Sequence, residues 1–260
     1  MRTLKKTLSV EVIKAKNTPA LWLIAIASAF LPIMQLLSYL HTDGSTIRLE
    51  PGENPWNSFS KNSFAMCSVF IIPMFVVLLV CLLLNIEHKS NTWKHLFVLP
   101  VSKKQIFGSK YFLVICMLLT FYFIFIMLIL LDGWLLTIWI KEANPNHLSV
   151  DWYQIGKLAI QSFVSTLPIL AIHFWLSFRI KNLITNIGIG LVGIITGLVL
   201  ASPGTWDKVF YYPYALPALL AYKLNPNYHY ADYPVNLYGI IYFFVISILC
   251  YFDFSKNFRG

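Results

Sequence analysis

Long apolar runs separated by short polar segments dominate this sequence of 260 residues. A helix that crosses the roughly 30 Å hydrocarbon core of a bilayer needs about 20 consecutive apolar residues. The runs that reach this length without a Lys, Arg, Asp or Glu extend from Asn17 to Leu40, Asn62 to Ile86, Tyr111 to Leu131, Leu158 to Phe178, Asn182 to Trp206 and Tyr233 to Phe252. None shows the two-residue alternation of a membrane β-barrel strand. The pattern therefore predicts an all-α, polytopic membrane protein with six transmembrane helices in one domain, residues 1–260.

The composition agrees with a membrane protein. Apolar residues make up 58% of the chain and charged residues 12%, whereas about a quarter of a soluble globular domain is charged. Four cysteines, Cys67, Cys81, Cys116 and Cys250, all lie in predicted spans. Their position indicates apolar packing residues and not a disulfide framework.

The distribution of positive charge predicts the orientation. Most of the 20 Lys and Arg residues lie in the N-terminal segment, in the loops after the second and fourth spans, and in the C-terminal tail. Because short loops rich in Lys and Arg stay on the cytoplasmic side, we expect both termini in the cytoplasm. The net charge of +9 is then explained by topology and by attraction to anionic lipid headgroups. Nucleic acid is not needed as a partner.

The N-terminal segment, residues 1–18, has the pattern of an amphipathic helix. Leu4, Leu8 and Val12 recur every four residues, with Lys5 and Lys6 beside them. This spacing predicts an elbow helix that lies in the cytoplasmic interface before the first span. An ordinary basic segment that only sets the topology is the alternative.

The cytoplasmic loop over residues 87–110 contains a second short apolar pattern. Trp93, Leu96 and Phe97 form one face of a short helix that Asn91 or Thr92 caps. Pro100 ends it, because a proline disfavours helix in the preceding residue. Such a helix either floats in the membrane interface or docks in a groove of another protein. The pattern alone favours a helix that lies in the membrane interface.

A new helix is predicted to start directly after this loop. Ser102 and Gln105 have the spacing of a capping box, in which each side chain satisfies an exposed backbone donor near the other residue. The helix then continues into the third span. The short helix of the loop is thus held between two longer helices.

Two features mark the region from the fifth span onward. Gly193 and Gly197 form a small-xxx-small pair that lets helices approach closely. This pair suits packing within the chain or a homodimer seam. Residues 207–232 are apolar but too short and too interrupted by Pro213 and Pro217 to span a bilayer. We therefore expect residues 207–232 to form short or re-entrant helices at the outer interface, with tyrosines at headgroup depth.

Candidate catalytic chemistry is sparse. The sequence contains no glycine-rich loop ending in Gly-Lys-Ser or Gly-Lys-Thr, so nucleotide hydrolysis would require another chain. No pair of its histidines has a helix-face ligand spacing, which argues against a metal site. Asp132 is expected at the outer mouth, as a cap or rim charge. His173 is interpreted as a packed, neutral histidine bonded to a neighbouring helix, and a gating or substrate role is the alternative.

Two cytoplasmic stretches resemble a known family. One is Glu11-x-x-Lys14-x-Lys16-Asn17 ahead of Leu21-Trp22-Leu23. The other runs from Glu87 through Thr92-Trp93-Lys94 to Leu99-Pro100-Val101-Ser102-Lys103 and Ser109-Lys110. Together with the six spans, they are similar to permeases of the ABC-2 exporter class. The most similar branch includes lantibiotic and bacteriocin immunity permeases and bacitracin-resistance permeases.

The resemblance implies a half-transporter in the bacterial cytoplasmic membrane. Two permease copies would each sit on a cytoplasmic ABC ATPase, and ATP and Mg would bind that ATPase and not this chain. The residues that would couple this chain to the ATPase are Glu87, Trp93, Lys94, Leu96, Phe97 and Leu99. The resemblance therefore favours docking over floating for the short helix. The chain departs from the family pattern by lacking a large outer domain between the first two spans.

The function expected from the resemblance is ATP-driven export of an amphiphilic substrate, such as a peptide antibiotic, without enzymatic activity on this chain. An exporter or flippase of lipids or other amphiphiles is the alternative within transport. A membrane scaffold or sensor that recruits a cytoplasmic partner through the same loop is the alternative outside it.

Overall fold

The computed structural model describes residues 2–16, 18–41, 55–89, 102–139, 150–202, 204–224 and 234–257. Within these ranges the regular structure is entirely helical. The helices are α1 (Arg2–Lys16), α2 (Ala20–His41), α3 (Pro55–Met66), the π-helix η1 (Cys67–Ile71), α4 (Ile72–Lys89), α6 (Lys103–Trp139), α7 (Trp152–Arg179), α8 (Leu183–Leu200), the 3₁₀ turns η3 (Val209–Tyr211) and η4 (Pro213–Ala215), α9 (Leu216–Leu224) and α10 (Val235–Asn257).

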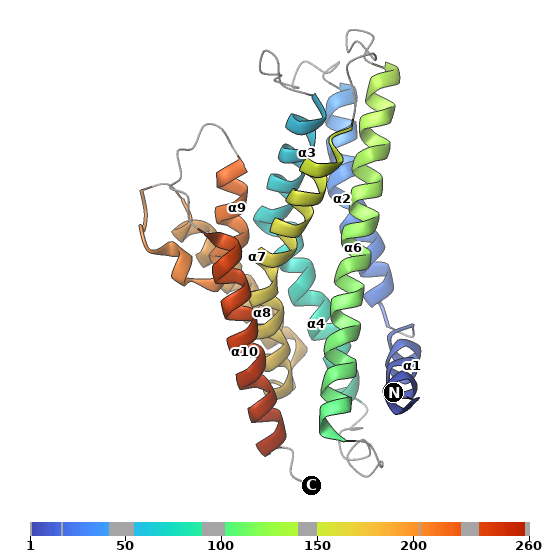
Figure 1. Ribbon diagram of the computed structural model, residues 1–260, viewed down its shortest axis with the longest axis vertical. Coiled ribbons are helices and arrows are strands. Elements are labelled where there is room, and N and C mark those ends of the chain that lie inside the picture. The colour runs from blue at the N-terminus through green and yellow to red at the C-terminus, as the bar shows by residue number, and fades with distance from the viewer. Residues whose placement is uncertain are drawn as a thin grey trace.

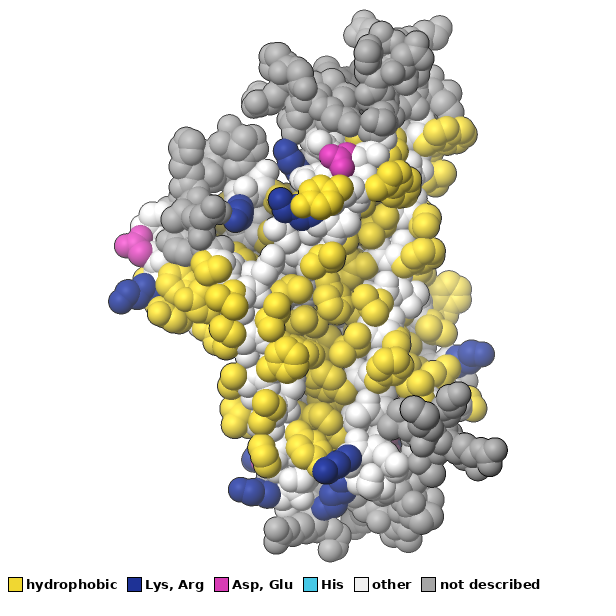
Figure 2. Space-filling model, in the orientation of Figure 1, with side chains coloured by type: hydrophobic (Ala, Val, Ile, Leu, Met, Phe, Trp, Pro, Cys, Tyr) yellow, Lys and Arg dark blue, Asp and Glu magenta, His cyan; other side chains and the backbone are white. Residues whose placement is uncertain are grey.

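Six of the helical segments are long and apolar enough to cross a membrane, as the sequence predicts. They are Ala20–His41, Trp56–Lys89, Lys103–Leu135, Trp152–Arg179, Leu183–Leu200 and Val235–Lys256. Both ends of the chain lie at the lower end of the bundle in Figure 1, beside the lower ends of α4 and α6. In Figure 2 a broad apolar band covers the middle of the visible face, and Lys and Arg side chains lie both below and above it.

Several helices extend beyond the apolar runs. The longest, α6, has 37 residues, and at 1.5 Å per residue it is about 55 Å long, well over the thickness of the hydrocarbon core. The predicted capping box at its start is confirmed. The Gln105 backbone N–H donates to Ser102 Oγ over 3.4 Å, and the Ser102 N–H donates to Gln105 Oε1 over 3.3 Å.

The fifth span is shorter than predicted. The helix α8 ends at Leu200 and not at Trp206. The sequence Ser202-Pro203-Gly204 follows closely, and proline cannot continue the ladder of backbone hydrogen bonds. Gly204 has a φ of 78°, which glycine adopts without the steric cost of a side chain. The chain therefore turns back after α8 and continues into η3, η4 and α9.

The span formed by α3, η1 and α4 contains a π-helical turn at Cys67–Ile71. Pro73 follows this turn within α4 and has no backbone N–H to donate. The hydrogen-bond ladder shifts locally, so that the Ile72 N–H donates to the Cys67 carbonyl. Next to the turn, Ser68 Oγ lies 3.0 Å from Ser162 Oγ of α7, and Tyr122 OH of α6 also lies 3.0 Å from Ser162 Oγ. These hydroxyls join three spans in the interior.

Aromatic packing fills the lower part of the core. Phe107 of α6 lies 5.4 Å from Phe174 of α7 and 5.6 Å from Phe254 of α10, measured between ring centroids. Tyr111 packs on Phe174 at 4.5 Å. These contacts fix the start of α6 against α7 and α10.

Candidate functional site at the lower end of the bundle

Four charged side chains meet at the lower end of the bundle, and we call them the charge cluster: Glu11, Lys14, Glu87 and Lys110. Lys110 Nζ lies 2.7 Å from Glu11 Oε2 and 2.7 Å from Glu87 Oε1. Lys14 Nζ lies 2.8 Å from the same Glu87 oxygen and 3.6 Å from Glu11 Oε1. Two positive and two negative charges therefore balance within the cluster.

The cluster is largely closed to solvent. The side chains of Glu87 and Lys110 are 1% and 5% exposed, and that of Lys14 is 25% exposed. Burial by itself lowers the pKa of Lys14, but the hydrogen bond to Glu87 and the charges of Glu11 and Glu87 outweigh it, so the pKa of Lys14 is raised. Buried charges are tolerated only when they are paired in this way.

Three helices contribute to the charge cluster. Glu11 and Lys14 lie three residues apart on α1 and therefore on one face. Glu87 lies in the last turn of α4, and Lys110 lies two turns into α6. Residues 90–101, which connect α4 to α6, lie outside the described part of the chain. The charge cluster thus links α4 and α6, the two helices on either side of residues 90–101, to each other and to α1.

Further polar contacts link the other helices at the same end. His88 Nε2 of α4 lies 2.7 Å from the Ser177 carbonyl of α7. Lys103 Nζ of α6 donates to the Ser255 carbonyl of α10 over 3.3 Å. Asp253 of α10 pairs with Arg179 of α7 and accepts a hydrogen bond from Trp175 Nε1 over 2.8 Å. The lower end is therefore cross-linked by polar contacts from α1 to α10.

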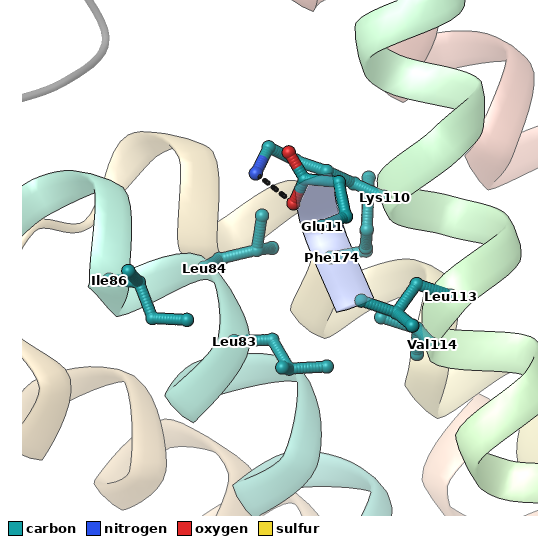
Figure 3. A pocket seen from close by; sticks show the side chains of 8 residues that line it. All are labelled: Glu11, Leu83, Leu84, Ile86, Lys110, Leu113, Val114 and Phe174. Atoms are coloured by element: carbon teal, nitrogen blue, oxygen red, sulfur yellow. Dashed lines mark hydrogen bonds and ion pairs between the residues drawn. The ribbon is translucent and has the colours of Figure 1, made fainter. Parts of the chain in front are cut away.

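A small apolar pocket adjoins the cluster (Figure 3). Apart from the Glu11–Lys110 pair, it is lined by Leu83, Leu84, Ile86, Leu113, Val114 and Phe174. Figure 3 shows Lys110 and Glu11 joined by a hydrogen bond, with the leucine side chains of α4 and α6 and Phe174 around the pocket. The ion pairs therefore lie in apolar surroundings, where their electrostatic interaction is stronger than in water.

Of the residues expected to couple the permease to an ATPase, Glu87 alone lies in the described part of the chain. Its contacts in the structure are with other residues of the same chain. The family resemblance implies a role for this residue in coupling to an ATPase. It is 0% exposed and bonded to Lys14 and Lys110 of its own chain. An effect of Glu87 on a partner protein would therefore pass through α1, α4 and α6. The other expected coupling residues, Trp93, Lys94, Leu96, Phe97 and Leu99, lie outside the described residues.

The face of α1 that packs on the bundle includes a charged residue, and part of the apolar pattern of the helix remains exposed. Leu8 packs on the core, but Val12 is 39% exposed and Ile13 62% exposed. The face toward the bundle carries Glu11 and Ala15, which are buried. Pairing of Glu11 with Lys110 decides the rotation of the helix, because an unpaired buried carboxylate is more costly than exposed valines at a lipid interface.

The two glycines of the predicted seam pack within the chain. A Cβ at Gly193 would lie 2.8 Å from the Tyr214 ring, and one at Gly197 would lie 2.7 Å from the Tyr214 carbonyl oxygen. They thus allow η4 to approach α8 closely. Tyr214 lies in the bundle interior and not at headgroup depth, whereas Tyr211 is 55% exposed.

His173 lies in a buried polar network, bonded to a neighbouring helix as expected. Its Nδ1 is 3.2 Å from Asn186 Oδ1 of α8, and its Nε2 is 3.0 Å from Tyr214 OH. Asn186 Nδ2 also contacts Ser177 Oγ. A neutral ring that donates from Nδ1 and accepts at Nε2 satisfies both partners. This arrangement explains the histidine as a structural link between α7, α8 and η4.

Asp132, expected as a cap or rim charge, is instead buried, with 4% of its surface exposed. It lies near the upper end of α6, and its Oδ2 has no hydrogen-bond partner.

The mutual contact of the four charged side chains is not predictable from the sequence. Glu11, Lys14, Glu87 and Lys110 all belong to the two stretches that resemble a family, but nothing in their spacing shows that α1 folds back on α4 and α6. One usable signal is the spacing of Glu11 and Lys14 on one helix face. Another is the presence of Lys110 and Glu87 directly beside apolar runs.

The six spans and the cross-linked lower end define a polytopic helical membrane protein. The chain belongs to the ABC-2 family of transporter proteins, because the family described as "ABC-2 family transporter protein" matches residues 7–197. This match covers the charge cluster and the first four spans in full, and it makes the chain a membrane permease subunit of an ABC transporter. No curated protein and no solved structure matches the chain.

Proposed function

We propose that this permease exports an amphiphilic substrate across the bacterial cytoplasmic membrane, driven by a separate ABC ATPase that binds ATP and Mg. The resemblance to immunity and bacitracin-resistance permeases supports a peptide antibiotic as the substrate. Two permease copies, each on one ATPase, form the transporter. The observation that carries the proposal is the charge cluster, which joins the two helices on either side of residues 90–101.

The orientation follows from the distribution of charge. The lower end of the bundle carries Lys14 and Lys89 in the described residues, together with Lys103, Lys104 and Arg179. Basic residues of short loops remain on the cytoplasmic side. The loop between α4 and α6 therefore faces the cytoplasm, where the ATPase is located.

The coupling step rests on the short helix that the sequence predicts from Trp93 to Leu99. Its apolar face, formed by Trp93, Leu96 and Phe97, docks in a groove of the ATPase. ATP-driven closure of the ATPase moves this helix, and the displacement reaches the ends of α4 and α6. Because Glu87 and Lys110 are bonded to each other and to α1, the three helices move as one body. A rigid-body movement of this kind opens a transport path between packed helices.

The proposal is tested with Phe97→Asp, which places a charge on the docking face. Phe97→Leu is the matched control, because it keeps the side chain apolar. The permease is reconstituted with its ATPase in lipid nanodiscs, and ATP hydrolysis and co-purification are measured. We expect Phe97→Asp to lose the stimulation of ATP hydrolysis and Phe97→Leu to keep most of it. Full stimulation in the Phe97→Asp variant, inserted at normal levels, contradicts the proposal.

A further inference from the structure

Asp132 is a buried carboxyl group, and one of its two oxygens has no hydrogen-bond partner. Its side chain lies in α6 near the upper end of the bundle, its exposed fraction is 4%, and Oδ2 makes no hydrogen bond. An ionised carboxylate in such a place costs several kcal/mol, about as much as other unpaired buried charges. In transmembrane segments, ionisable residues of this kind mark functional sites.

A second buried oxygen without a partner lies on the neighbouring helix. Asn57 Oδ1 of α3 is closed to solvent and makes no hydrogen bond. Both atoms are hydrogen-bond acceptors when Asp132 is ionised. They are two of the three such side-chain atoms among the described residues, the third being Asn236 Oδ1, whereas nearly all buried polar atoms are paired in folded proteins.

The packing of α3 against α6 sets the two residues at the same level. The helices run in opposite directions in Figure 1. The ring of Phe64 lies 5.3 Å from that of Phe125, and the Trp56 ring fills the place of a side chain at Gly133.

Asn57 follows Trp56, and Asp132 precedes Gly133. Each is also seven residues, close to two helical turns, from the Phe64–Phe125 contact. Asn57 and Asp132 therefore lie on the faces of α3 and α6 that meet.

One proton satisfies both atoms. We propose that Asp132 is a proton-binding site: in this conformation it carries a proton on its carboxyl group and donates it to Asn57 Oδ1, which joins α6 to α3 at the upper end. A metal ion needs several oxygen ligands, and both oxygens here are sealed from solvent. The bound species is therefore a proton.

Other titratable groups at this level belong to three neighbouring helices. Tyr39 and His41 lie on α2, and Lys61 lies on α3. Asp151 and Lys157 lie at the start of α7, together with Tyr153. None of them is bonded to Asp132 Oδ2. Tyr39 OH accepts a hydrogen bond from Gln35 Nε2 over 3.1 Å, and so belongs to a separate contact.

The site makes the upper end sensitive to protons. When α3 and α6 separate there, water reaches the carboxyl group, which ionises and releases its proton to water. Rebinding of the proton is then required before the helices close. Closure of the upper end is favoured at low pH, and this inference does not depend on the identity of the substrate or on coupling to an ATPase.

Infrared spectroscopy of the full chain in lipid nanodiscs at neutral pH tests the site, because a protonated carboxyl group has a C=O stretch that a carboxylate lacks. We expect a protonated-carboxyl band in the wild type, its loss in Asp132→Asn, and its shift to higher frequency in Asn57→Leu. Asp151→Asn is the matched control. Asp151 caps α7 by accepting from the Gln154 N–H, asparagine is an equally good cap, and the band should remain.

Each variant is first checked for a monodisperse profile on size-exclusion chromatography. Asp132→Asn replaces one neutral group with another of the same shape and is expected to fold. Absence of the band in folded wild type overturns the proposal, since the carboxyl group is then ionised and has an unknown cation as its partner. A band that persists in Asp132→Asn, or that does not shift in Asn57→Leu, overturns it as well.

Discussion

The two ends of the bundle treat buried carboxyl groups in opposite ways. At the lower end, Glu87 is completely buried and accepts from two lysines. At the upper end, Asp132 is almost equally buried and has no bonded partner for Oδ2. The difference teaches that burial alone does not decide the state of a carboxyl group. A buried carboxyl group stays ionised where lysine side chains pair with it, and it is expected to be protonated where its only neighbour is a hydrogen-bond acceptor.

This contrast also separates two kinds of mechanical link. Ion pairs hold α1, α4 and α6 together. A single shared proton would hold α3 and α6 together only while it is bound. The lower end is therefore suited to transmit force, and the upper end to open and close.

The largest expected effect comes from removing the charge of Glu87. Glu87→Gln leaves Lys110 and Lys14 in a buried site with Glu11 as the remaining anion. Breaking a buried pair in this way costs about 3–5 kcal/mol. We expect a clear loss of thermal stability, measured as the unfolding midpoint in detergent micelles. A midpoint equal to that of the wild type would show that the cluster does not hold the three helices together.

A smaller effect is expected at Lys14, which is partly exposed. Lys14→Met removes hydrogen bonds to charged groups, each worth about 1.5–3 kcal/mol, but leaves the Lys110 pairs intact. Because the pKa of Lys14 is raised above 10.5 in the folded state, its contribution is complete at lower pH and is lost as the pH rises through the raised value. The difference in unfolding midpoint between wild type and Lys14→Met should thus be constant from pH 6 to pH 9. A difference that vanishes within this range contradicts the assignment.

The smallest expected effect is that of Asp132→Asn. If Asp132 is neutral, the amide replaces an uncharged group of the same shape, and the change in stability is less than about 1 kcal/mol. Glu87→Gln is the matched comparison, since both variants remove one carboxyl group from the interior. A loss of stability at Asp132 as large as that at Glu87 would show that Asp132 is ionised and paired.

The sequence predicts the membrane-spanning part of the fold well, because each span is a local property of some twenty residues. The capping box of Ser102 and Gln105 is confirmed for the same reason. The end of α8 is wrong by six residues, because the charge-free run continues to Trp206 although the helix ends at Leu200 and the chain turns at Gly204. The absence of charged residues does not distinguish the end of a span from the exposed turn that follows it.

The candidate site is less predictable. The charge cluster joins Glu11 to Lys110, which are 99 residues apart, and no local pattern specifies such a contact. The face of α1 that packs on the bundle is not predictable for the same reason, since the spacing of apolar residues does not show that Glu11 pairs with Lys110. Gly193 and Gly197 signal a close approach, but the sequence does not show that the approaching segment is η4 of the same chain.

The central claim is that the loop between α4 and α6 meets the ATPase on the cytoplasmic side. It is tested most directly by labelling Trp93→Cys with a membrane-impermeant thiol reagent. Cys116, the one native cysteine in the structure that is partly accessible, is replaced by serine to lower the background. The account predicts labelling in inside-out vesicles, protection from it by the bound ATPase, and none in intact cells. Labelling of Trp93→Cys from outside intact cells would contradict it.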